Sequence, residues 1–356
     1  MAPRPAELGA RAISHILPTK SPPLTILAIE TSCDETSAAL VCGYDVLSNV
    51  VSSQVALHQK WGGIVPEAAA RAHVESVLPV LGEAMSGGER PDAIAVTNRP
   101  GLVGALSVGV SAAKALAIAW DISLIGIHHL EGHILSPLAI RPDLPYPHVC
   151  LVASGGHTEL VEVSAPGVYR IIGQTLDDAA GEAFDKAARL LGLGYPGGRA
   201  IQEAALGGNP TRYALPKGLS GDTLDYSFSG LKTAAKRLVE SEGESLSVRD
   251  AAASVQEAII SVLAERAVRA AERLRISTLT LVGGVAANVA LRELLAAECG
   301  RAGIDFVTPP LDLCTDNAAM IGIAAGFRLQ RGERDGWDLD VYANAPLPGE
   351  RMMFGS

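Results

Sequence analysis

The sequence is short of aromatic side chains and of charge. Of its 356 residues, 4% are aromatic and 19% are charged, whereas 48% are hydrophobic and 37 are glycine. A core of small aliphatic side chains joined by many tight turns favours an α/β protein over a β-sandwich. The length allows one large domain or two lobes, each with its own buried core.

Paired cysteines and long uncharged hydrophobic runs are also missing. The five cysteines are scattered, odd in number and form no C-x-x-C pair, which predicts a reduced, cytoplasmic protein. The most apolar stretch, residues 101–119, contains Ser107, Ser111 and Lys114, so we expect no membrane span. Residues 1–22 have no signal-peptide apolar block, and they predict a disordered N-terminal extension.

Positive charge is not in excess either. The net charge is −10, so the composition gives no sign of a surface that binds nucleic acid unaided. A nucleic-acid substrate would need a local basic patch, or a partner protein that supplies the positive field.

What the sequence does contain is a repeated strand–turn–strand pattern. Residues 24–30 and 37–42 read as strands around a polar turn, and residues 148–153 and 159–163 repeat the pattern about 120 residues later. The repeat predicts two lobes built on one plan. Three prolines between residues 141 and 147 mark the boundary. We expect lobes over residues 23–145 and 146–330, followed by a surface tail over residues 331–356.

Further elements fill in each lobe. A helix over residues 103–119 lies between predicted strands at 93–97 and 124–127, an order that implies parallel pairing with a right-handed crossover. The second lobe contains long helical stretches at 177–191 and 248–274, then a strand at 278–282.

Two histidines have the spacing of metal ligands. His129 and His133 are four residues apart, so on a helix they project from the same face. Asp316 is the candidate third ligand. The alternatives are helix histidines bonded to nearby carbonyls, and Asp316 as the N-cap of a helix over residues 318–328. The H-E-x-x-H pattern is absent, so a zinc-peptidase mechanism lacks its general base.

Three glycine loops end predicted elements, at residues 154–156, 196–198 and 283–284. Glycines let backbone N–H groups approach an anion closely, and a helix N-terminus adds a favourable field. Each loop alone is weak evidence, but together they favour a nucleotide bound between two lobes. The G-x-x-x-x-G-K-[ST] pattern of a P-loop does not occur.

Acidic residues cluster in two places. Asp178, Glu182 and Asp185 recur at helical spacing, either as a solvated stripe or with Asp185 accepting hydrogen bonds from a ribose. Around the first hairpin turn, Asp34 and Glu35 follow Glu30. Acids are ordinary in turns, but these would also suit proton transfer or a metal-phosphate contact, and Asp34 and Glu35 are our catalytic candidates.

Several stretches together resemble the TsaD family, bacterial type, formerly called O-sialoglycoprotein endopeptidases. The match runs in order from about residue 24 to about residue 330, and the combination is highly specific. The stretches are residues 29–36 (IETSCDET), 62–67 (GGIVPE), 128–133 (HHLEGH), 154–158 (SGGHT), 177–186 (DDAAGEAFDK), 225–232 (DYSFSGLK), 283–288 (GGVAAN) and 314–317 (CTDN). The resemblance implies a two-lobed actin/Hsp70/sugar-kinase-like α/β fold.

The resemblance also implies an activity. Members transfer threonylcarbamoyl from threonylcarbamoyl-AMP to the exocyclic amine of the adenosine beside the anticodon, in tRNAs that read codons beginning with A. A divalent metal, usually Fe²⁺ and alternatively Zn²⁺, would be bound by His129, His133 and Asp316. Partners would be a TsaB-like paralogue and a TsaE-like P-loop ATPase. The substrate contacts carried over by motif are Val152, Ala153, Ser154, Gly155, Gly156, Asp185, Gly198 and Asn288.

One position departs from the family pattern. Arg99 stands before Pro100-Gly101 where the family usually has glycine. It could alter the turn or place a positive charge near the cleft. The alternatives to the transferase are an ATP-hydrolysing or sugar-phosphorylating enzyme of the same fold, a catalytically silent scaffold and, last, a metallopeptidase. The enzyme of the same fold and the scaffold assign no function to the two histidines and Asp316.

Overall fold

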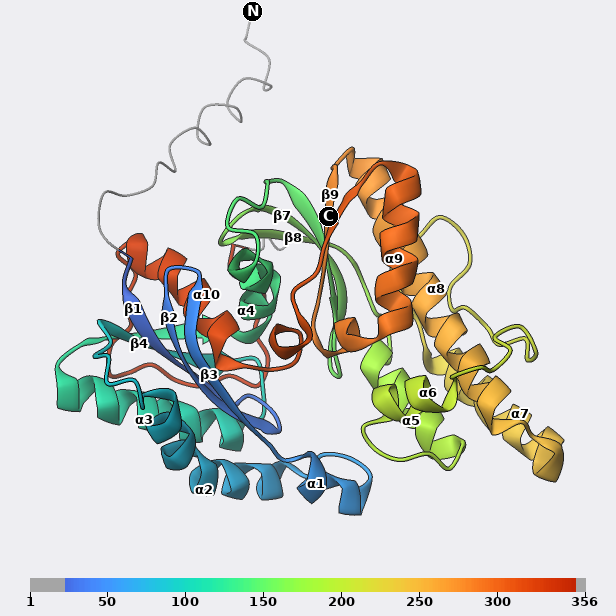
Figure 1. The fold of residues 1–356 in the computed structure, drawn as a ribbon, viewed down its shortest axis with the longest axis horizontal. Coiled ribbons are helices and arrows are strands. Elements are labelled where there is room, and N and C mark those ends of the chain that lie inside the picture. Colours follow the sequence, from blue (N-terminus) through green and yellow to red (C-terminus); the bar gives the residue numbers. More distant parts are fainter. Residues whose placement is uncertain (1–22, 350–356) are drawn as a thin grey trace, which may run out of the picture.

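The computed structural model describes residues 23–349, and the predicted extension over residues 1–22 lies outside them. The chain forms two five-stranded mixed sheets with helices around and between them (Figure 1). The first sheet has the order β3-β2-β1-β4-β5. Its strands are β1 (Thr25–Glu30), β2 (Glu35–Cys42), β3 (Asp45–Ser53), β4 (Ala93–Arg99) and β5 (Ser123–His128).

The second sheet repeats the first. Its order is β10-β9-β6-β7-β8, and its central strand β6 pairs antiparallel with β7 and parallel with β9, just as β1 pairs with β2 and β4. The predicted duplication is therefore confirmed at the level of topology. The strands are β6 (His148–Ala153), β7 (Thr158–Ala165), β8 (Val168–Gln174), β9 (Thr278–Val282) and β10 (Asp305–Val307).

The helices form three layers around the two sheets. Helices α2 (Pro66–Ala84) and α3 (Val103–Trp120) cover the outer face of the first sheet. The outer face of the second sheet is covered by α5 (Ala180–Leu190), α6 (Gly197–Ala204), α7 (Ser229–Glu242), α8 (Val248–Leu274) and α9 (Val289–Ala302). Between the sheets lie α4 (His129–Leu135) and α10 (Ala318–Gln330), whose apolar side chains share one core with the inner faces of both sheets.

Short helical turns connect these elements. They are α1 (Val55–His58) and the 3-10 helices η1 (Gln59–Trp61), η2 (Ser136–Ala139), η3 (Gly243–Ser245), η4 (Gly284–Ala287) and η5 (Leu311–Leu313).

Burial on both faces explains the apolar runs in the central strands. In β1, Ile26 and Ala28 face the core between the sheets, whereas Leu27 and Ile29 face α2 and α3. A strand covered on both sides reads as a continuous hydrophobic run, and this made it recognisable in the sequence. The predicted strands and the helices at 103–119 and 248–274 are all present, while the helix predicted from residue 177 begins at Ala180.

Two C-terminal segments depart from simple expectation. Helix α10 lies within the range assigned to the second lobe, yet it packs against β1 and β2 of the first sheet. Residues 331–349 contain no helix or strand, but they are bound along the first lobe. Asn98 Nδ2 donates to the carbonyl of Asp340 at 2.8 Å, and the Gly126 N–H donates to Asp335 Oδ2 at 2.7 Å.

Helix α3 alone among the helices of residues 23–349 has the length and hydropathy of a membrane-spanning helix. One face of it, including Leu106 and Val110, is buried against the first sheet and α2. The amphipathic contact is that of a core helix flanking a sheet. All five cysteines lie within the described residues and are free, with Cys150, Cys299 and Cys314 buried.

Candidate functional site

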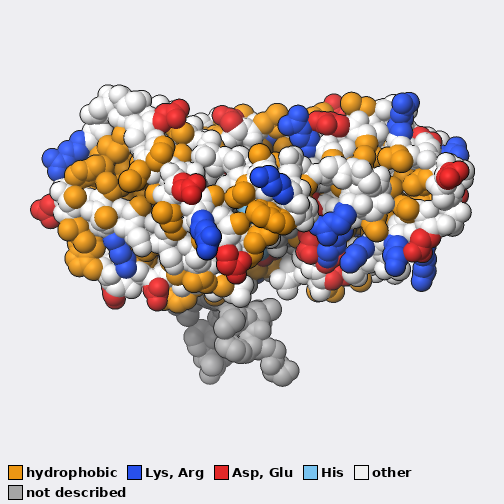
Figure 2. Space-filling view, turned by 90° about the horizontal axis from the view of Figure 1, so that it is seen from below, with side chains coloured by type: hydrophobic (Ala, Val, Ile, Leu, Met, Phe, Trp, Pro, Cys, Tyr) orange, Lys and Arg blue, Asp and Glu red, His pale blue; other side chains and the backbone are white. Residues whose placement is uncertain are grey.

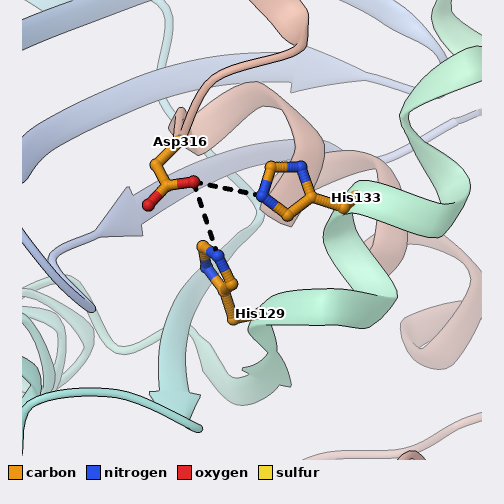
Figure 3. A group of neighbouring side chains, drawn as sticks. All are labelled: His129, His133 and Asp316. Atoms are coloured by element: carbon orange, nitrogen blue, oxygen red, sulfur yellow. Dashed lines mark hydrogen bonds and ion pairs between the residues drawn. The ribbon is translucent and has the colours of Figure 1, made fainter. Parts of the chain in front are cut away.

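The two predicted histidine ligands lie on α4, directly after β5. The side chain of His128 caps this helix, because its Nδ1 accepts from the Leu130 N–H at 3.2 Å. One helical turn separates His129 and His133, and both side chains point toward Asp316 (Figure 3). His133 is fully buried and His129 is 7% exposed.

Asp316 comes from the loop before α10. The N-cap of α10 is its neighbour Asn317, whose Oδ1 accepts from the Met320 N–H at 3.1 Å. The capping role considered for Asp316 is therefore filled by another residue. The loop is also tied to the first lobe, since the Ala318 N–H donates to Ser37 Oγ at 2.9 Å.

The three side chains converge closely enough to share one ion. Asp316 Oδ1 is 3.1 Å from His133 Nε2 and 3.5 Å from His129 Nε2, and the three ligand atoms lie within 4.8 Å of one another. The two imidazole rings are perpendicular, with centroids 4.8 Å apart. Two imidazole nitrogens and one carboxylate oxygen form a donor set that suits Fe²⁺ or Zn²⁺ and leaves coordination positions open.

A second layer of contacts fixes the first histidine. His129 Nδ1 lies 3.0 Å from Glu30 Oε2 and 3.1 Å from Ser32 Oγ, so its Nε2 is the nitrogen that faces Asp316. The same Glu30 oxygen accepts from the Thr97 hydroxyl at 2.5 Å. A carboxylate behind a ligating histidine is the arrangement that orients the ring and raises its basicity. These partners differ from the backbone carbonyls expected for purely structural histidines.

The electrostatics of the cluster favour a bound cation. Burial lowers the pKa of His129, but Asp316 and Glu30 outweigh this and hold the pKa well above its ordinary value. Burial raises the pKa of Asp316, yet the two histidines hold that pKa well below its ordinary value. Meanwhile His133 Nδ1 is buried without a hydrogen-bond partner. Carboxylates that favour a proton on His129 also favour a metal ion beside it.

The acidic turn between β1 and β2 lies next to this cluster. Glu35 Oε1 accepts from the Ser53 hydroxyl at 2.8 Å. Burial, partly offset by the hydrogen bond from Ser53 and assisted by Asp34, raises the pKa of Glu35 to about 8. Burial and then Asp316 raise the pKa of Asp34. In the second lobe, burial and then the charge of Asp34 raise the pKa of the Tyr195 hydroxyl, so the two groups interact across the lobes.

Two of the three predicted glycine loops, at residues 154–156 and 283–284, meet in the second lobe, while the loop at 196–198 packs against Asp185 of α5. Gly283 has a φ of +91°, and a Cβ there would lie 2.4 Å from the carbonyl oxygen of Ala153. The Gly181 N–H donates to the Ser154 carbonyl at 3.1 Å, which brings the start of α5 to the same place. By contrast, Cβ atoms at Gly155 and Gly156 would meet nothing within 4 Å, so these two glycines border open space.

The remaining predicted substrate contacts surround these loops. Val152 and Ala153 are buried at the end of β6. Asp185 Oδ1 accepts from the Gly197 N–H at 2.7 Å, and a Cβ at Gly198 would border open space. Asn288 caps α9 through its Oδ1, 3.0 Å from the Leu291 N–H, and its Nδ2 donates to Gln256 at 2.9 Å. Its side chain is largely used within the protein.

The predicted acidic stripe does not lie on one helix, because Asp178 precedes α5 while Glu182 and Asp185 lie on it. Asp178 and Glu182 both pair with Lys186, at 2.6 and 2.8 Å, as expected for a solvated charged face. Asp185 stands apart from these ion pairs. Sequence reasoning passed over Asp177, which accepts from the Phe228 N–H at 2.7 Å and from the hydroxyls of Ser227 and Ser229.

Sequence reasoning also missed His157 as a neighbour of the metal cluster. Burial lowers the pKa of His157 to about 4, and the next contributions come from His129 and His133. Its N–H donates to Ser154 Oγ at 3.1 Å, which closes the glycine turn. Its place in Ser154-Gly155-Gly156-His157 was the available signal.

Arg99 is the last residue of β4 and pairs with His128 across the sheet. Its guanidinium donates to Asn98 Oδ1 at 3.2 Å. Burial lowers the pKa of Arg99, followed by Arg328, while Asp335 raises it. The charge of Arg99 thus interacts with Arg328 and with Asp335 of the C-terminal segment, and Gly101 lies so close to the Ser32 carbonyl that a Cβ there would be 2.6 Å from its oxygen.

Known proteins resemble this chain in sequence and in fold. The TsaD family profile, described as tRNA N6-adenosine threonylcarbamoyltransferase, matches residues 45–323. A protein of that name from Anaeromyxobacter dehalogenans (strain 2CP-C) is 52% identical over 325 residues, covering 89% of this chain and 97% of the relative. Another, from Thermomicrobium roseum, is 50% identical over 357 residues, covering 91% of this chain and 97% of the relative.

A solved structure supports the fold assignment. Full-length HypF in its phosphate- and nucleotide-bound form superposes with a TM-score of 0.57 at 13% identity, covering 91% of this chain and 48% of HypF. At that identity the likeness shows the fold alone, and it agrees with the predicted two-lobed actin/Hsp70/sugar-kinase-like fold. Because the family profile spans most of the sequence and the relatives match at about half identity over nearly their whole length, the chain belongs to the TsaD family.

Proposed function

We propose that the protein transfers threonylcarbamoyl from threonylcarbamoyl-AMP to N6 of the adenosine beside the anticodon in tRNAs reading codons that begin with A. The observation that carries this proposal is the convergence of His129, His133 and Asp316 beside an acidic turn, opposite the glycine loops of the second lobe. Family membership supports the same conclusion.

The reaction is an acyl transfer with a phosphate leaving group. The N6 amine attacks the carbamoyl carbonyl, a C–N bond forms, the C–O bond to phosphate breaks, and AMP departs while the amine loses a proton. Held by His129, His133 and Asp316, a divalent metal would supply Lewis acidity toward a substrate oxygen. The chain must then position a weakly nucleophilic amine, bind the AMP part and accept the proton.

Asp34 and Glu35 divide the proton transfer in this proposal. With a pKa of about 8, Glu35 stays protonated near neutral pH and can donate a hydrogen bond. Asp34 also has a raised pKa, which makes its carboxylate a better proton acceptor than an ordinary aspartate. We assign Asp34 Oδ as the acceptor of the N6 proton and Glu35 as the group that holds Asp34 and the amine in place.

The second lobe binds the nucleotide part in this proposal. Backbone N–H groups of Gly155 and Gly156 border open space and suit an anion. Asp185 has one carboxylate oxygen beyond the one that binds Gly197, and this oxygen suits a ribose hydroxyl. Residues 152–154 and Gly198 line the same site. Asn288 contributes by holding the start of α9, with at most one remaining N–H for the ligand.

The metal and the partners are the finer parts of the proposal. We assign Fe²⁺ to the site, with Zn²⁺ as the alternative that the donor set equally allows. The partners would be a TsaB-like paralogue and a TsaE-like ATPase, in the cytoplasm. Exposed apolar side chains on α2 and α3, among them Val74, Leu78 and Ile118, support a protein contact, and Figure 2 shows apolar side chains gathered over these two helices.

An ATP-hydrolysing or sugar-phosphorylating activity is less well supported. It would use the two lobes and the glycine loops but leave the two histidines and Asp316 unexplained. A silent scaffold leaves them unexplained as well, and a peptidase lacks a placed general base.

The test is nucleoside analysis of tRNA incubated with the protein, threonylcarbamoyl-AMP and the two partners. We expect threonylcarbamoyladenosine with the wild type and none with His133→Ala, provided that circular dichroism shows both to be folded. Metal content of protein purified without oxygen would distinguish iron from zinc. Absence of the modified nucleoside with the wild type, while a known homologue forms it in the same reaction, would refute the proposal.

A further inference from the structure

The segment from Gln59 to Gly63, which we call the bridging loop, links the two lobes at the edge of the site. Gln59 Nε2 donates to the carbonyl of Tyr195 at 2.8 Å. In the other direction, the guanidinium of Arg189 on α5 donates to the carbonyl of Gly62. Gly62 has a φ of +64°, the left-handed conformation that ends η1 and turns the chain back. The bridging loop therefore extends from the first lobe and rests on the second.

A short series of contacts connects the bridging loop to the acidic turn. The Gln54 N–H donates to the carbonyl of Asp34 at 3.0 Å. The Gln54 side chain lies 3.2 Å from His58 Nε2, and the buried His58 ring is 6.2 Å from the ring of Trp61. The charge of the candidate metal ligand Asp316 in turn raises the pKa of Asp34. The bridging loop is thus connected by direct contacts to the acidic turn beside the candidate metal ligands.

The surface of this edge combines an indole with two cations. Trp61 is 54% exposed, in a chain where only 4% of residues are aromatic. Lys60 and Arg189 are exposed, and within residues 23–349 neither forms an ion pair. Other exposed cations, such as Arg199 and Lys236, pair with a glutamate one turn away. In a protein with a net charge of −10, unpaired cations beside an exposed indole are a local exception.

We propose that the bridging loop binds unpaired nucleotides of the RNA substrate next to the target adenosine. The Trp61 indole stacks on a base, and Lys60 and Arg189 contact the flanking phosphates. Single-stranded RNA is recognised mainly by aromatic stacking and cationic contacts of this kind. The inference rests on the proposed function, because it takes the substrate to be a tRNA whose target base lies in a loop.

An indole beside cations could also anchor a protein partner. RNA is favoured because neither cation forms an ion pair within residues 23–349, and because the bridging loop is bonded through Gln54 to the acidic turn assigned to the reacting amine. The broad apolar surface lies elsewhere, over α2 and α3.

The experiment measures binding of an anticodon stem-loop RNA to the full-length protein assembled with its partners. Loss of one stacked base predicts about 5- to 150-fold weaker binding for Trp61→Ala, whereas Trp61→Phe should keep most of the affinity. Lys60→Ala should reduce the slope of log affinity against log salt by about one. Controls are Trp337→Ala, which removes an equally exposed indole (57%) from the C-terminal segment, and Lys236→Ala on α7. Steady-state rates should show a raised KM for RNA with kcat retained.

Three other outcomes would distinguish RNA binding at the bridging loop from a protein interface there and from failure of the proposed function. If Trp61→Ala and Trp61→Phe bind the stem-loop as tightly as the wild type, the proposal is wrong. If Trp61→Ala leaves RNA affinity unchanged but prevents assembly with the partners, the edge is a protein interface and the proposal is equally wrong. If the wild type binds the stem-loop but forms no modified adenosine, the proposed function fails, while the Trp61 comparison still decides whether RNA binds here.

Discussion

The two lobes share one topology but place different chemistry at the same point of it. In the first lobe the central strand β1 ends at the buried Glu30, and the turn that follows contains Asp34. In the second lobe the equivalent turn after β6 contains Gly155 and Gly156, which have no side chains and border open space. The turn after β1 thus presents carboxylates, which can bind cations or protons, whereas the glycine turn after β6 leaves room for an anion. A duplicated scaffold becomes an asymmetric site by exchanging side chains at a single turn.

The largest effect should come from removing a ligand that the first lobe supplies. We expect His133→Ala to lose the bound metal and at least about 1,000-fold in turnover, because catalytic metals contribute several kcal/mol of transition-state stabilisation. Metal analysis and single-turnover assays measure the two losses. A His133→Ala protein that is folded, free of metal and still fully active would remove the first lobe from the chemistry.

A smaller effect should follow from removing the carboxylate of Glu30 that orients the candidate ligand His129. Glu30→Gln keeps the shape but removes the carboxylate from His129 Nδ1, 3.0 Å away. We expect metal affinity or activity to fall by about 10- to 100-fold, as for other partners of ligating histidines. Titration with Fe²⁺ or Zn²⁺ measures this directly. Equal affinity in Glu30→Gln and the wild type would mean that the ring is oriented by Ser32 and packing alone.

The glycine turn of the second lobe can be tested by a substitution that displaces it. A Cβ at Gly181 would lie 2.7 Å from the Ser154 carbonyl and 2.8 Å from Gly155 Cα, so Gly181→Ala must displace the turn. We expect a loss of about 1–3 kcal/mol in the free energy of unfolding and weaker binding of AMP. Gly300→Ala is the matched control, because its Cβ would meet nothing within 4 Å. If both variants bind AMP equally, the turn does not contact the nucleotide.

The raised pKa of Glu35 in the acidic turn should make the free energy of unfolding depend on pH. The pKa of Glu35 is raised from 4.5 to about 8, so the native state holds a proton that the unfolded state releases between these values. Stability from this group is present below pH 4.5 and is lost as the pH rises to 8. Glu35→Gln should therefore gain on the order of 1–3 kcal/mol relative to the wild type between pH 5 and pH 8. Denaturant unfolding at both pH values measures it, and a constant difference would place the Glu35 pKa near its ordinary value.

The smallest effect should come from the charged stripe around the start of α5. Asp178 pairs with Lys186 at the surface, so Asp178→Asn should change stability by no more than about 1 kcal/mol and leave turnover unchanged. The informative partner is Asp185→Asn, in the second turn of α5, for which we expect weaker nucleotide binding. Equal behaviour of the two variants would mean that Asp185 only holds Gly197.

Much of this asymmetry was readable from the sequence, because the repeated hairpin and the H-x-x-x-H spacing are local patterns. The choice between Asp316 and Asn317 as the cap of α10 was not readable, since both residue types cap helices well. Asn288 posed the same ambiguity, and here the capping role is present. Strand β3 and helix α2 were not predicted: β3 lies at an exposed sheet edge without a continuous apolar run, and α2 contains Pro79.

Long-range packing was the other limit. Nothing in residues 318–330 indicates that α10 crosses back to the first sheet, because its apolar faces would fit either lobe. Similarly, residues 331–349 lack periodicity, yet the His128 side chain lies 3.1 Å from the carbonyl of Ala345. Such contacts depend on where two distant segments meet, which a single sequence does not encode locally.

The placement of α4 and α10 has a consequence for how the two parts of the site are held relative to each other. Helix α10 packs on the first sheet and Ser37 fixes its start, whereas α4 contacts strands of both sheets, so the three ligand side chains are held by the first lobe and by the core between the sheets. The glycine turns belong to the second lobe. In the proposed function the second lobe would bind the acyl phosphate, so the donor and the metal ligands would come from different sides of the site. Their spacing would then depend on how the two lobes sit relative to each other, which makes the core between the sheets the part that sets the reaction geometry.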